Sequence, residues 1–208
     1  MTIPEKRSGH LRIMTQAMNW LYRNWYCSTI FLAIFVLIFS MAYILDEDMA
    51  LFLIWMQTVV YFVHQFEEYV LPGGFVEFFN REMLGSTSAD FPLDLKASFW
   101  INIPIIFVAF PISALLSGIV GLTVGLWTAY FSLINALSHV GMSLKVGYNP
   151  GLIVSIVLNI PVSLFTIYYF ISNDISSITS NLTSFLIALL VQITLMIFGF
   201  RVLKPRAR

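Results

Sequence analysis

Residues 49–70 read MALFLIWMQTVVYFVHQFEEYV, an apolar run that ends in three ionisable side chains. The run is long enough to cross the hydrocarbon core of a bilayer as a helix. His64, Glu67 and Glu68 lie within five positions of one another near its end. Ionisable groups are costly in hydrocarbon, so they are usually paired, directed into the helix bundle and functional. We therefore predict that this helix carries a buried functional cluster.

The overall composition is that of a membrane protein. The 208 residues are 59% hydrophobic and 11% charged, with a mean hydropathy of +0.85, whereas a soluble domain carries about 25% charged residues. We expect an all-α, polytopic membrane helical bundle, located in the plasma (inner) membrane if the source is bacterial. The single cysteine, Cys27, excludes an intrachain disulfide. The sequence also lacks a Gly-rich phosphate-binding loop and a basic patch, so nucleic acid is not an expected partner.

Apolar segments recur along the chain at the length of a transmembrane helix. Each contains about 20 residues, which is enough to span roughly 30 Å of hydrocarbon. The third and fourth segments are separated only at Ser117-Gly118, and we place the break between them there. The chain then divides into an amphipathic segment (1–25), a transmembrane domain (26–203) and a basic tail (204–208). The six predicted transmembrane helices lie near residues 26–45, 49–70, 97–117, 119–143, 150–171 and 182–203.

The distribution of basic residues predicts the orientation in the membrane. Lysine and arginine collect in the cytoplasmic connections of membrane proteins. With six spans, all 11 Lys and Arg residues fall before the first span, in alternate connections or at the end of the last span. This pattern predicts that the N- and C-termini are both cytoplasmic. Residues 1–25 repeat apolar side chains at three- and four-residue spacing, which predicts an interfacial amphipathic helix; a partly ordered tail is the alternative.

Further polar residues are expected at the depth of the cluster. The fourth predicted span carries Asn135 and His139 four residues apart, and therefore on one helical face. Asn102 lies six residues beyond Lys96, which corresponds to roughly 9 Å of depth on a helix that rises 1.5 Å per residue. We therefore expect these residues to share a layer with the cluster of the second span, just beneath the cytoplasmic headgroups.

The spacing within the cluster suits a metal site. On a helix His64 shares a face with either Glu67 or Glu68, while the two carboxylates point about 100° apart. Imidazole and carboxylate ligands favour a divalent cation, for which we prefer zinc over ferrous iron. We predict His64, Glu68 and His139 as metal ligands, which leaves a coordination position open for water. The other carboxylate would act as general base, with the two glutamates interchangeable at this stage; a purely structural His–Glu pair is the alternative.

Two loops flank the layer on the same side. Leu71-Pro72-Gly73-Gly74 breaks the helix directly after the cluster, and the segment beyond it, which contains Asn80, is expected to return to the membrane interface. Tyr148-Asn149-Pro150-Gly151 precedes the fifth span, where proline favours helix initiation. Its functional interpretation is a pocket wall in which Tyr148 donates a hydrogen bond. We predict Tyr148 as a catalytic residue beside the two glutamates, and the substrate-binding residues as Asn80, Asn102 and Asn135.

These motifs, in this order, resemble those of the HXXEE family of predicted integral membrane enzymes. The His-x-x-Glu-Glu motif of that family corresponds to His64, Glu67 and Glu68, its second histidine to His139, and its Tyr-x-Pro-Gly motif to residues 148–151. The matching region covers about residues 50–160. The resemblance implies an enzyme without specifying its reaction.

Three functions are compatible with these features. The first is a metal-dependent hydrolase of a lipid or lipid-linked substrate, in which the metal lowers the pKa of a bound water. The second is a metal-free acid–base isomerase of a sterol- or isoprenoid-like compound. The third is a proton-coupled transporter, because intramembrane glutamates and histidines also relay protons; a polar layer near one face, with only Asn159 nearer the midplane, argues against it. We expect an enzyme whose partners are membrane lipid and a lipid-like small molecule.

Overall fold

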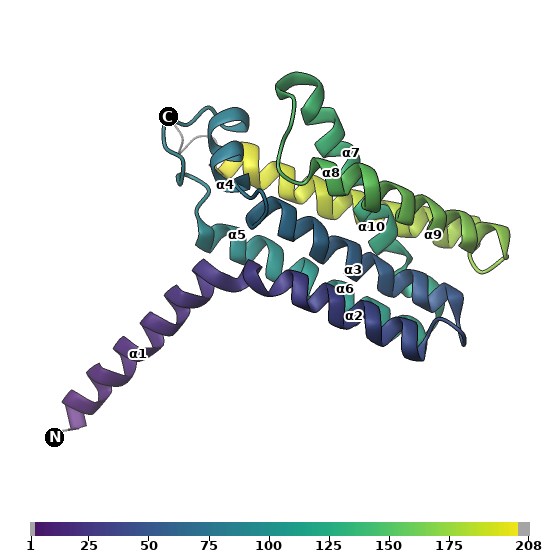
Figure 1. The fold of residues 1–208 in the computed structure, drawn as a ribbon, viewed down its shortest axis with the longest axis horizontal. Helices are drawn as coiled ribbons and strands as arrows, with labels where there is room; N and C mark the ends of the chain where they lie inside the picture. The colour runs from purple at the N-terminus through teal and green to yellow at the C-terminus, as the bar shows by residue number, and fades with distance from the viewer. Residues whose placement is uncertain (1–2, 204–208) are drawn as a thin grey trace.

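The computed structural model describes residues 3–203, with side chains from residue 12 onward. Every element of this part of the chain is helical, so the all-α prediction is confirmed for it; the basic tail predicted at 204–208 lies outside the described residues. Figure 1 shows a bundle of helices from which α1 projects. The main helices are α1 (Ile3–Asn24), α2 (Thr29–Tyr43), α3 (Met49–Tyr69), α5 (Leu95–Asn102), α6 (Phe110–Ile119), α7 (Leu126–Val146), α9 (Ile160–Ser172) and α10 (Ile178–Ile197).

Short helical segments join or extend these helices. Pro104 lies in one of them, η3, and Pro161 follows another, η5, by two residues. Proline lacks the N–H that an α-helical turn requires, and both η3 and η5 are wider π-helical turns, which are frequent at functional sites. The short segments are η1 (Trp25–Ser28), α4 (Phe75–Phe78), η2 (Phe79–Met83), η3 (Ile103–Ala109), η4 (Leu122–Gly125), α8 (Leu152–Val154), η5 (Ser155–Asn159) and η6 (Phe198–Leu203).

Five helical stretches of the described chain are long and apolar enough to cross a membrane, which supports a multi-pass membrane protein. Helix α7 has the same length as α3, 21 residues, but polar side chains such as Asn135 and His139 lower its hydropathy. The count of six spans and the cytoplasmic location of both termini therefore remain predictions. The five stretches are Arg12–Tyr43, Met49–Tyr69, Leu95–Ile119, Leu152–Ser172 and Ile178–Leu203.

The turn between the third and fourth predicted spans lies beyond Ser117-Gly118. Both residues belong to α6, which ends at Ile119, and α7 begins only at Leu126. Gly121, with a φ of 155°, makes the turn, in a conformation that glycine adopts without a steric penalty. The prediction at Ser117-Gly118 was wrong because Gly118 serves helix packing: a Cβ there would lie 3.3 Å from the Leu51 side chain.

The segment predicted to be an interfacial helix forms helix α1, which leaves the bundle (Figure 1). Its side chains Ile13, Met14 and Trp20 are exposed. The chain joins the bundle at Trp25, which is buried against the rings of Tyr69 and Phe107. The helical state is thus established for Ile3–Asn24, while its position on a membrane surface remains a prediction.

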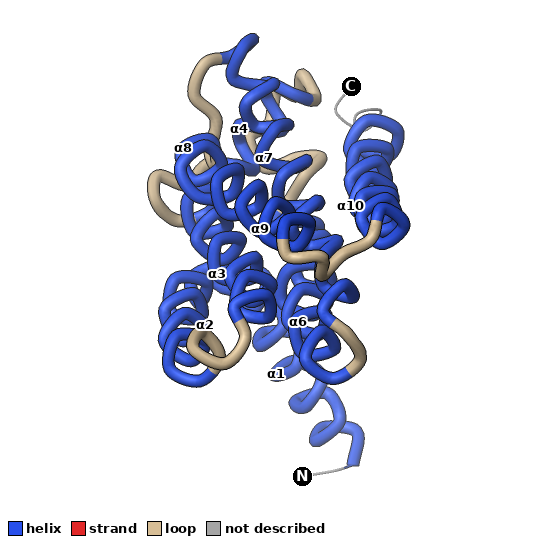
Figure 2. Tube along the Cα trace, turned by 90° about the vertical axis from the view of Figure 1, so that its right-hand side faces the viewer, coloured by secondary structure: helices blue, strands red, loops and turns tan. Residues whose placement is uncertain are grey.

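Helix α3 is the central helix of the bundle. Of its apolar stretch 67% is buried inside the protein, against 22–28% for the other four candidate spans, and Figure 2 shows it surrounded by its neighbours. Met56, Val59 and Phe62 of α3 belong to the main hydrophobic cluster together with Phe110 and Phe131. A helix that is enclosed by protein rather than lipid is where buried ionisable groups find partners.

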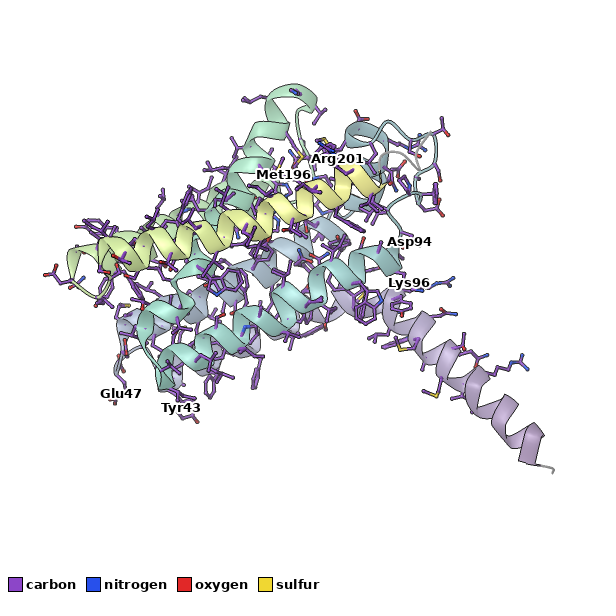
Figure 3. All side chains as sticks on the ribbon, turned by 180° about the vertical axis from the view of Figure 1, so that it is seen from behind. Tyr43, Glu47, Asp94, Lys96, Met196 and Arg201 are labelled. Atoms are coloured by element: carbon purple, nitrogen blue, oxygen red, sulfur yellow. The ribbon has the colours of Figure 1, made fainter. Side chains whose placement is uncertain are left out.

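Labelled basic residues lie at one end of the bundle, and an acidic connection lies at the other. Figure 3 shows Asp94, Lys96 and Arg201 at one end, and Glu47 at the opposite end. The connection that contains Glu47 reads Asp46-Glu47-Asp48. This separation is the pattern on which the membrane orientation was predicted. The HXXEE residues lie toward the end that carries the basic side chains.

Candidate functional site

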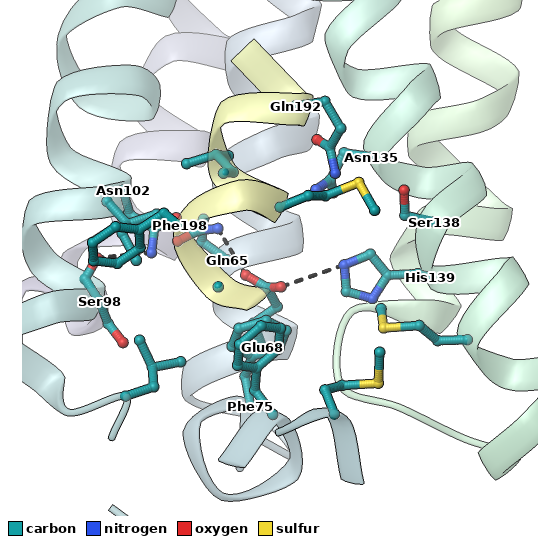
Figure 4. Close-up of a pocket in the computed structure, with 18 of the residues that line it drawn as sticks. Gln65, Glu68, Phe75, Ser98, Asn102, Asn135, Ser138, His139, Gln192 and Phe198 are labelled. Carbon is teal, nitrogen blue, oxygen red and sulfur yellow. Dashed lines mark hydrogen bonds and ion pairs between the residues drawn. The ribbon is translucent and has the colours of Figure 1, made fainter. Parts of the chain in front are cut away.

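Three buried side chains from two helices converge at the end of α3. His64 and Glu68 are one turn apart on α3, and His139 reaches them from α7. Glu68 Oε1 lies 3.5 Å from His64 Nε2 and 3.5 Å from His139 Nε2. Figure 4 shows Glu68 between Gln65 and His139. The predicted metal ligands are thus brought together, with the donor atoms of all three residues within 4.8 Å of one another.

The helical periodicity explains the convergence. Residues four apart on a helix share a face, so His64 and Glu68 both point toward α7, which packs against α3. All three side chains are buried, at 1%, 5% and 2% exposure for His64, Glu68 and His139. Tyr61, one turn before His64, stacks on Phe131 of α7, and this apolar contact holds the two helices together beneath the site.

The geometry of the three donors is compatible with a metal ion. His64 Nε2 makes no other hydrogen bond among the described residues, and its contact with Glu68 Oε1 is long, at 3.5 Å. Two ligands of a tetrahedral zinc with bonds of about 2.0 Å lie about 3.3 Å apart, close to the 3.5 Å that separates each imidazole nitrogen from Glu68 Oε1. The ligand set of two imidazoles and one carboxylate is one that zinc sites use.

Each histidine is oriented through its other ring nitrogen. Asn149 Oδ1 lies 2.7 Å from His139 Nδ1, and Asn149 Nδ2 donates to the His139 carbonyl oxygen at 3.0 Å. Ser155 Oγ lies 3.5 Å from His64 Nδ1. An Nδ1–H that donates to Asn149 leaves the Nε2 lone pair of His139 free to bind a cation. Such supporting hydrogen bonds are typical of metal-ligating histidines.

Glu68 is itself oriented by a neighbour. Gln65 Nε2 donates to Glu68 Oε2 at 2.8 Å, which leaves Oε1 directed at the two histidines. Gln65 belongs to the HXXEE stretch, although the sequence assigned no role to it. Its position three residues before Glu68 on α3 is the signal that predicts the contact.

Glu67 occupies a different environment from Glu68. Its carboxylate accepts the backbone N–H groups of Ile153, at 3.1 Å, and Val154, at 2.7 Å. Both belong to the first turn of the helical stretch Leu152–Ser172, where a negative charge is stabilised by unpaired N–H groups and the helix dipole. The Tyr148 hydroxyl also donates to Glu67 Oε1, at 3.0 Å. Glu67 therefore connects α3 to the start of the helical stretch Leu152–Ser172.

Tyr148 donates a hydrogen bond as expected, and its acceptor is Glu67. Partial burial, together with the hydrogen bond to Glu67 and its negative charge, raises the pKa of Tyr148 above its ordinary value. The phenol is therefore neutral, and a donor, at physiological pH. Its predicted catalytic role remains a prediction.

The Tyr148-Asn149-Pro150-Gly151 stretch wraps around the site. Gly151 has a φ of 97°, and a Cβ built on it would lie 2.8 Å from Cε1 of both His64 and His139. A larger residue would therefore displace the two rings, and only glycine combines this approach with this backbone conformation. The helix starts at Leu152, so the motif does more than initiate it. The sequence reasoning singled out the motif but missed the contacts of Asn149 and Gly151.

A cavity of about 630 Å³ adjoins the three donors. Glu68 and His139 line it, as do Asn102 and Asn135, so two of the three predicted substrate-binding asparagines face it. Asn102 Nδ2 donates to the Tyr69 hydroxyl oxygen and to the Ser98 carbonyl oxygen, at 3.1 and 2.9 Å. The volume is within the range of small-molecule sites, about 300–1,000 Å³.

Asn80 lies outside this cavity. Its Nδ2 donates to the carbonyl oxygens of Ala89 and Leu93, and its Oδ1 accepts the Leu93 N–H. The side chain thus organises the connection between η2 and α5. Its contact with a substrate remains a prediction that the cavity does not support.

The comparisons with known proteins identify a sequence family and no characterised relative. The sequence model of a family described as "Protein of unknown function with HXXEE motif" matches residues 55–166, more than half of the 208 residues. The match includes all three donor residues and the loop that wraps around them. No curated protein matches the chain, and no solved structure does.

Proposed function

The chain belongs to the HXXEE family, and on that premise we propose that it is a multi-pass membrane enzyme, a metal-dependent hydrolase of a lipid or lipid-linked substrate. The observation that carries the proposal is the convergence of His64, Glu68 and His139 beside a large cavity. Two of the three donors line that cavity, so a ligand in it would reach the same atoms that a metal would bind.

The surroundings of the two glutamates support different roles for them. Glu68 is the metal ligand in this proposal, since its Oε1 faces both histidines. Glu67 is a structural anchor, because its oxygens accept hydrogen bonds from Ile153, Val154 and Tyr148. The Glu68 Oε2 atom, held by Gln65, is the carboxylate oxygen placed to accept a proton from a water molecule between the site and the cavity.

A divalent metal, with zinc preferred over iron, would supply the remaining chemistry: it would lower the pKa of a bound water toward neutrality and polarise a substrate carbonyl. His139, oriented by Asn149, and His64, beside Ser155, would hold it. Asn102 and Asn135 line the cavity, and in this proposal they would orient the substrate.

The connectivity of the bundle supports six spans with both termini cytoplasmic. Helix α6 ends and α7 begins at the end of the bundle that carries Glu47, and α7 returns the chain to the end that carries Lys96. If α6 and α9 cross the membrane, α7 must cross it between them. The site then lies near the cytoplasmic surface, which would be the inner face of the plasma membrane in a bacterium.

Metal analysis tests the proposed function. We expect about one divalent metal ion per chain in purified wild-type protein, and its loss in His64→Ala and in His139→Ala. The matched control is His10→Ala on α1, which should retain the metal because α1 projects from the bundle (Figure 1). Retention of the metal in both site variants, or its absence from folded wild-type protein, would refute the metal-dependent hydrolase.

A metal-free acid–base isomerase is the second candidate. The specific observation is that Glu68 and His139 face the cavity in direct contact, while His64 does not line it. Such a pair can move a proton between two positions of an apolar substrate. An activity that persists in the presence of a chelator, and is lost in Glu68→Gln, would favour this candidate over the hydrolase.

A transporter is less well supported, although buried polarity extends further than expected. Gln57 Nε2 donates to Thr166 Oγ1 at 2.8 Å, and Ser163 Oγ donates to Gln57 Oε1 at 3.1 Å. These groups bond to one another, and an apolar cluster that includes Ile54 and Phe170 lies between them and the far end. A proton relay requires polar groups across the whole membrane.

A further inference from the structure

Gly141 lies in the interior of α7, where glycine is one of the least favourable residues. Close packing does not explain its presence, because a Cβ built on Gly141 would meet no described atom within 4 Å. Gly118, which is also inside a helix, differs in this respect, since its Cβ would lie 3.3 Å from the Leu51 side chain. Gly141 is exposed and lines the cavity. The missing side chain therefore leaves open space at the edge of the cavity.

Helix α10 begins against α7 but ends against a different part of the protein. Near its start, Asn181 Oδ1 accepts a hydrogen bond from the Tyr130 hydroxyl of α7, at 2.8 Å. At the other end, in η6, Leu203 is buried together with Leu84 and Leu93 of the connection between η2 and α5. Figure 1 and Figure 3 show the last turns of α7 leading away from α10. The two helices therefore separate toward the end of the bundle that carries the basic side chains.

The cavity reaches the surface of the protein in the space between these two helices. Gly141 lines it from α7 and Met196 lines it from α10, and both residues are exposed. Gly141 precedes Lys145 by four residues, which is roughly 6 Å of helix rise. Met196 precedes Arg201 by five residues, or roughly 7.5 Å. Because basic residues mark the cytoplasmic surface of a membrane, this opening lies at the depth of lipid chains.

The end of the cavity beyond α3 is covered by aromatic side chains. Phe75 and Phe79 line the cavity, and their rings stack with centroids 5.7 Å apart. Figure 4 shows Phe75 below Glu68. Glu82 and Lys145 also line the cavity and are exposed, so entry from water is the alternative route. The aromatic pair favours the opening between α7 and α10, because it covers the site on the aqueous side.

We propose that the substrate is a membrane lipid that enters the cavity laterally, between Gly141 of α7 and Met196 of α10. Gly141 keeps this passage open, and the unbranched, flexible side chain of Met196 lets a lipid chain move past it. The lipid then lies in the same cavity as Glu68 and His139, where the reaction would take place. This inference rests on the proposed function, because it names the source of the substrate and the route by which it reaches that site.

Chemical labelling of a cavity residue in lipid nanodiscs tests this route. Cys27 is the single cysteine, so Cys27→Ala gives a background without thiols, in which Ser138→Cys places one on the cavity wall. Ser138 lines the cavity three residues before Gly141, on the same face of α7. The probes are hexadecyl methanethiosulfonate, which dissolves in the bilayer, and sulfonatoethyl methanethiosulfonate, which is anionic and stays in water.

We expect the thiol of Ser138→Cys to react with the hexadecyl reagent and to be protected from the anionic one. The reference for reaction in water is Glu47→Cys, because Glu47 is exposed in the connection between α2 and α3. Anionic labelling of Ser138→Cys as fast as that of Glu47→Cys would overturn the inference in favour of entry from water. Failure of both reagents to label Ser138→Cys would overturn it as well, because the cavity would then be closed to lipid.

Substitutions of Gly141 assign the entrance. Combined with Ser138→Cys, Gly141→Trp should abolish labelling by the hexadecyl reagent, whereas Gly141→Ala, whose methyl group leaves the passage open, should retain it. Ile193→Cys is the control, because Ile193 is exposed on α10 outside the cavity lining, eight residues before Arg201. Its labelling should persist in Gly141→Trp, which also reports that the variant is folded in the bilayer. Unchanged labelling of Ser138→Cys in folded Gly141→Trp would contradict the proposed entrance.

Metal content, measured separately on the same samples, distinguishes this inference from the proposed function, since the labelling does not require a metal. Folded protein that holds no metal, but whose labelling is lost in Gly141→Trp, would refute the hydrolase and leave the lateral route standing. Protein that holds one metal ion per chain, but whose labelling is the same in Gly141→Trp, would refute the lateral route alone.

Discussion

Asn149 holds His139 at two points, the ring and the main chain. Its Oδ1 lies 2.7 Å from His139 Nδ1, while its Nδ2 donates to the His139 carbonyl oxygen at 3.0 Å. Asn149 is fully buried, and it belongs to the loop that connects α7 to α8. The loop therefore sets both the direction and the tautomer of a histidine that lies ten residues earlier in the chain.

Replacement of Asn149 by alanine should weaken metal binding without removing a ligand. Loss of a supporting hydrogen bond to a metal-bound histidine typically costs 10–100-fold in affinity, and we expect a loss of about this size in Asn149→Ala. The measurement is a competition titration with a chelator. Asn173→Ala is the matched control, since Asn173 is exposed and bonds to the Tyr169 carbonyl oxygen away from the site; wild-type affinity in Asn149→Ala would contradict the orienting role.

Replacement of Gly151 by alanine should disturb the site directly. Its Cβ would lie 2.8 Å from both imidazole rings, so we expect loss of the bound metal in addition to a destabilisation of about 1–3 kcal/mol from the backbone conformation. Gly74→Ala separates the two effects: Gly74 has a similar φ of 91°, but nothing lies within 4 Å of its Cβ position. In Gly151→Ala, both the metal content and the thermal unfolding temperature should fall. In Gly74→Ala, only the unfolding temperature should fall.

The two glutamates should respond differently to the same substitution. In Glu68→Gln we expect loss of the metal, because a carboxylate ligand becomes a neutral amide. In Glu67→Gln we expect the metal to remain and the protein to lose about 1–2 kcal/mol of stability, because the charge at the helix start is removed. Metal analysis and unfolding of the two variants in parallel provide the measurement, and loss of metal in Glu67→Gln alone would reverse the assignment.

Tyr148→Phe should reveal the hydrogen bond to Glu67 through its dependence on pH. The pKa of Tyr148 is raised in the folded protein, so folding favours the protonated phenol. The stability that Tyr148 contributes should be fully present below the ordinary tyrosine pKa of about 10, and should decline as the pH rises above it. Unfolding of wild type and Tyr148→Phe at pH 8 and pH 11 tests this; a difference between them that grows with pH would contradict it.

The predicted helices were largely correct because each apolar run has the length and composition of a membrane helix. The second span was predicted at 49–70 and observed at Met49–Tyr69. The error at Ser117-Gly118 arose because a small residue can serve either a turn or a close helix contact. The sequence pattern alone does not distinguish the two uses.

The sequence by itself determined the chemistry available: the helix that carries His64 and Glu68 on one face, and a second histidine at matching depth on another helix. Tertiary structure alone decided which glutamate faces the histidines, since both lie one turn from His64 and only the position of the helix that starts at Leu152 separates them. It also revealed Asn149, Gly151 and the cavity, because contacts between distant segments depend on how the helices pack and not on local spacing.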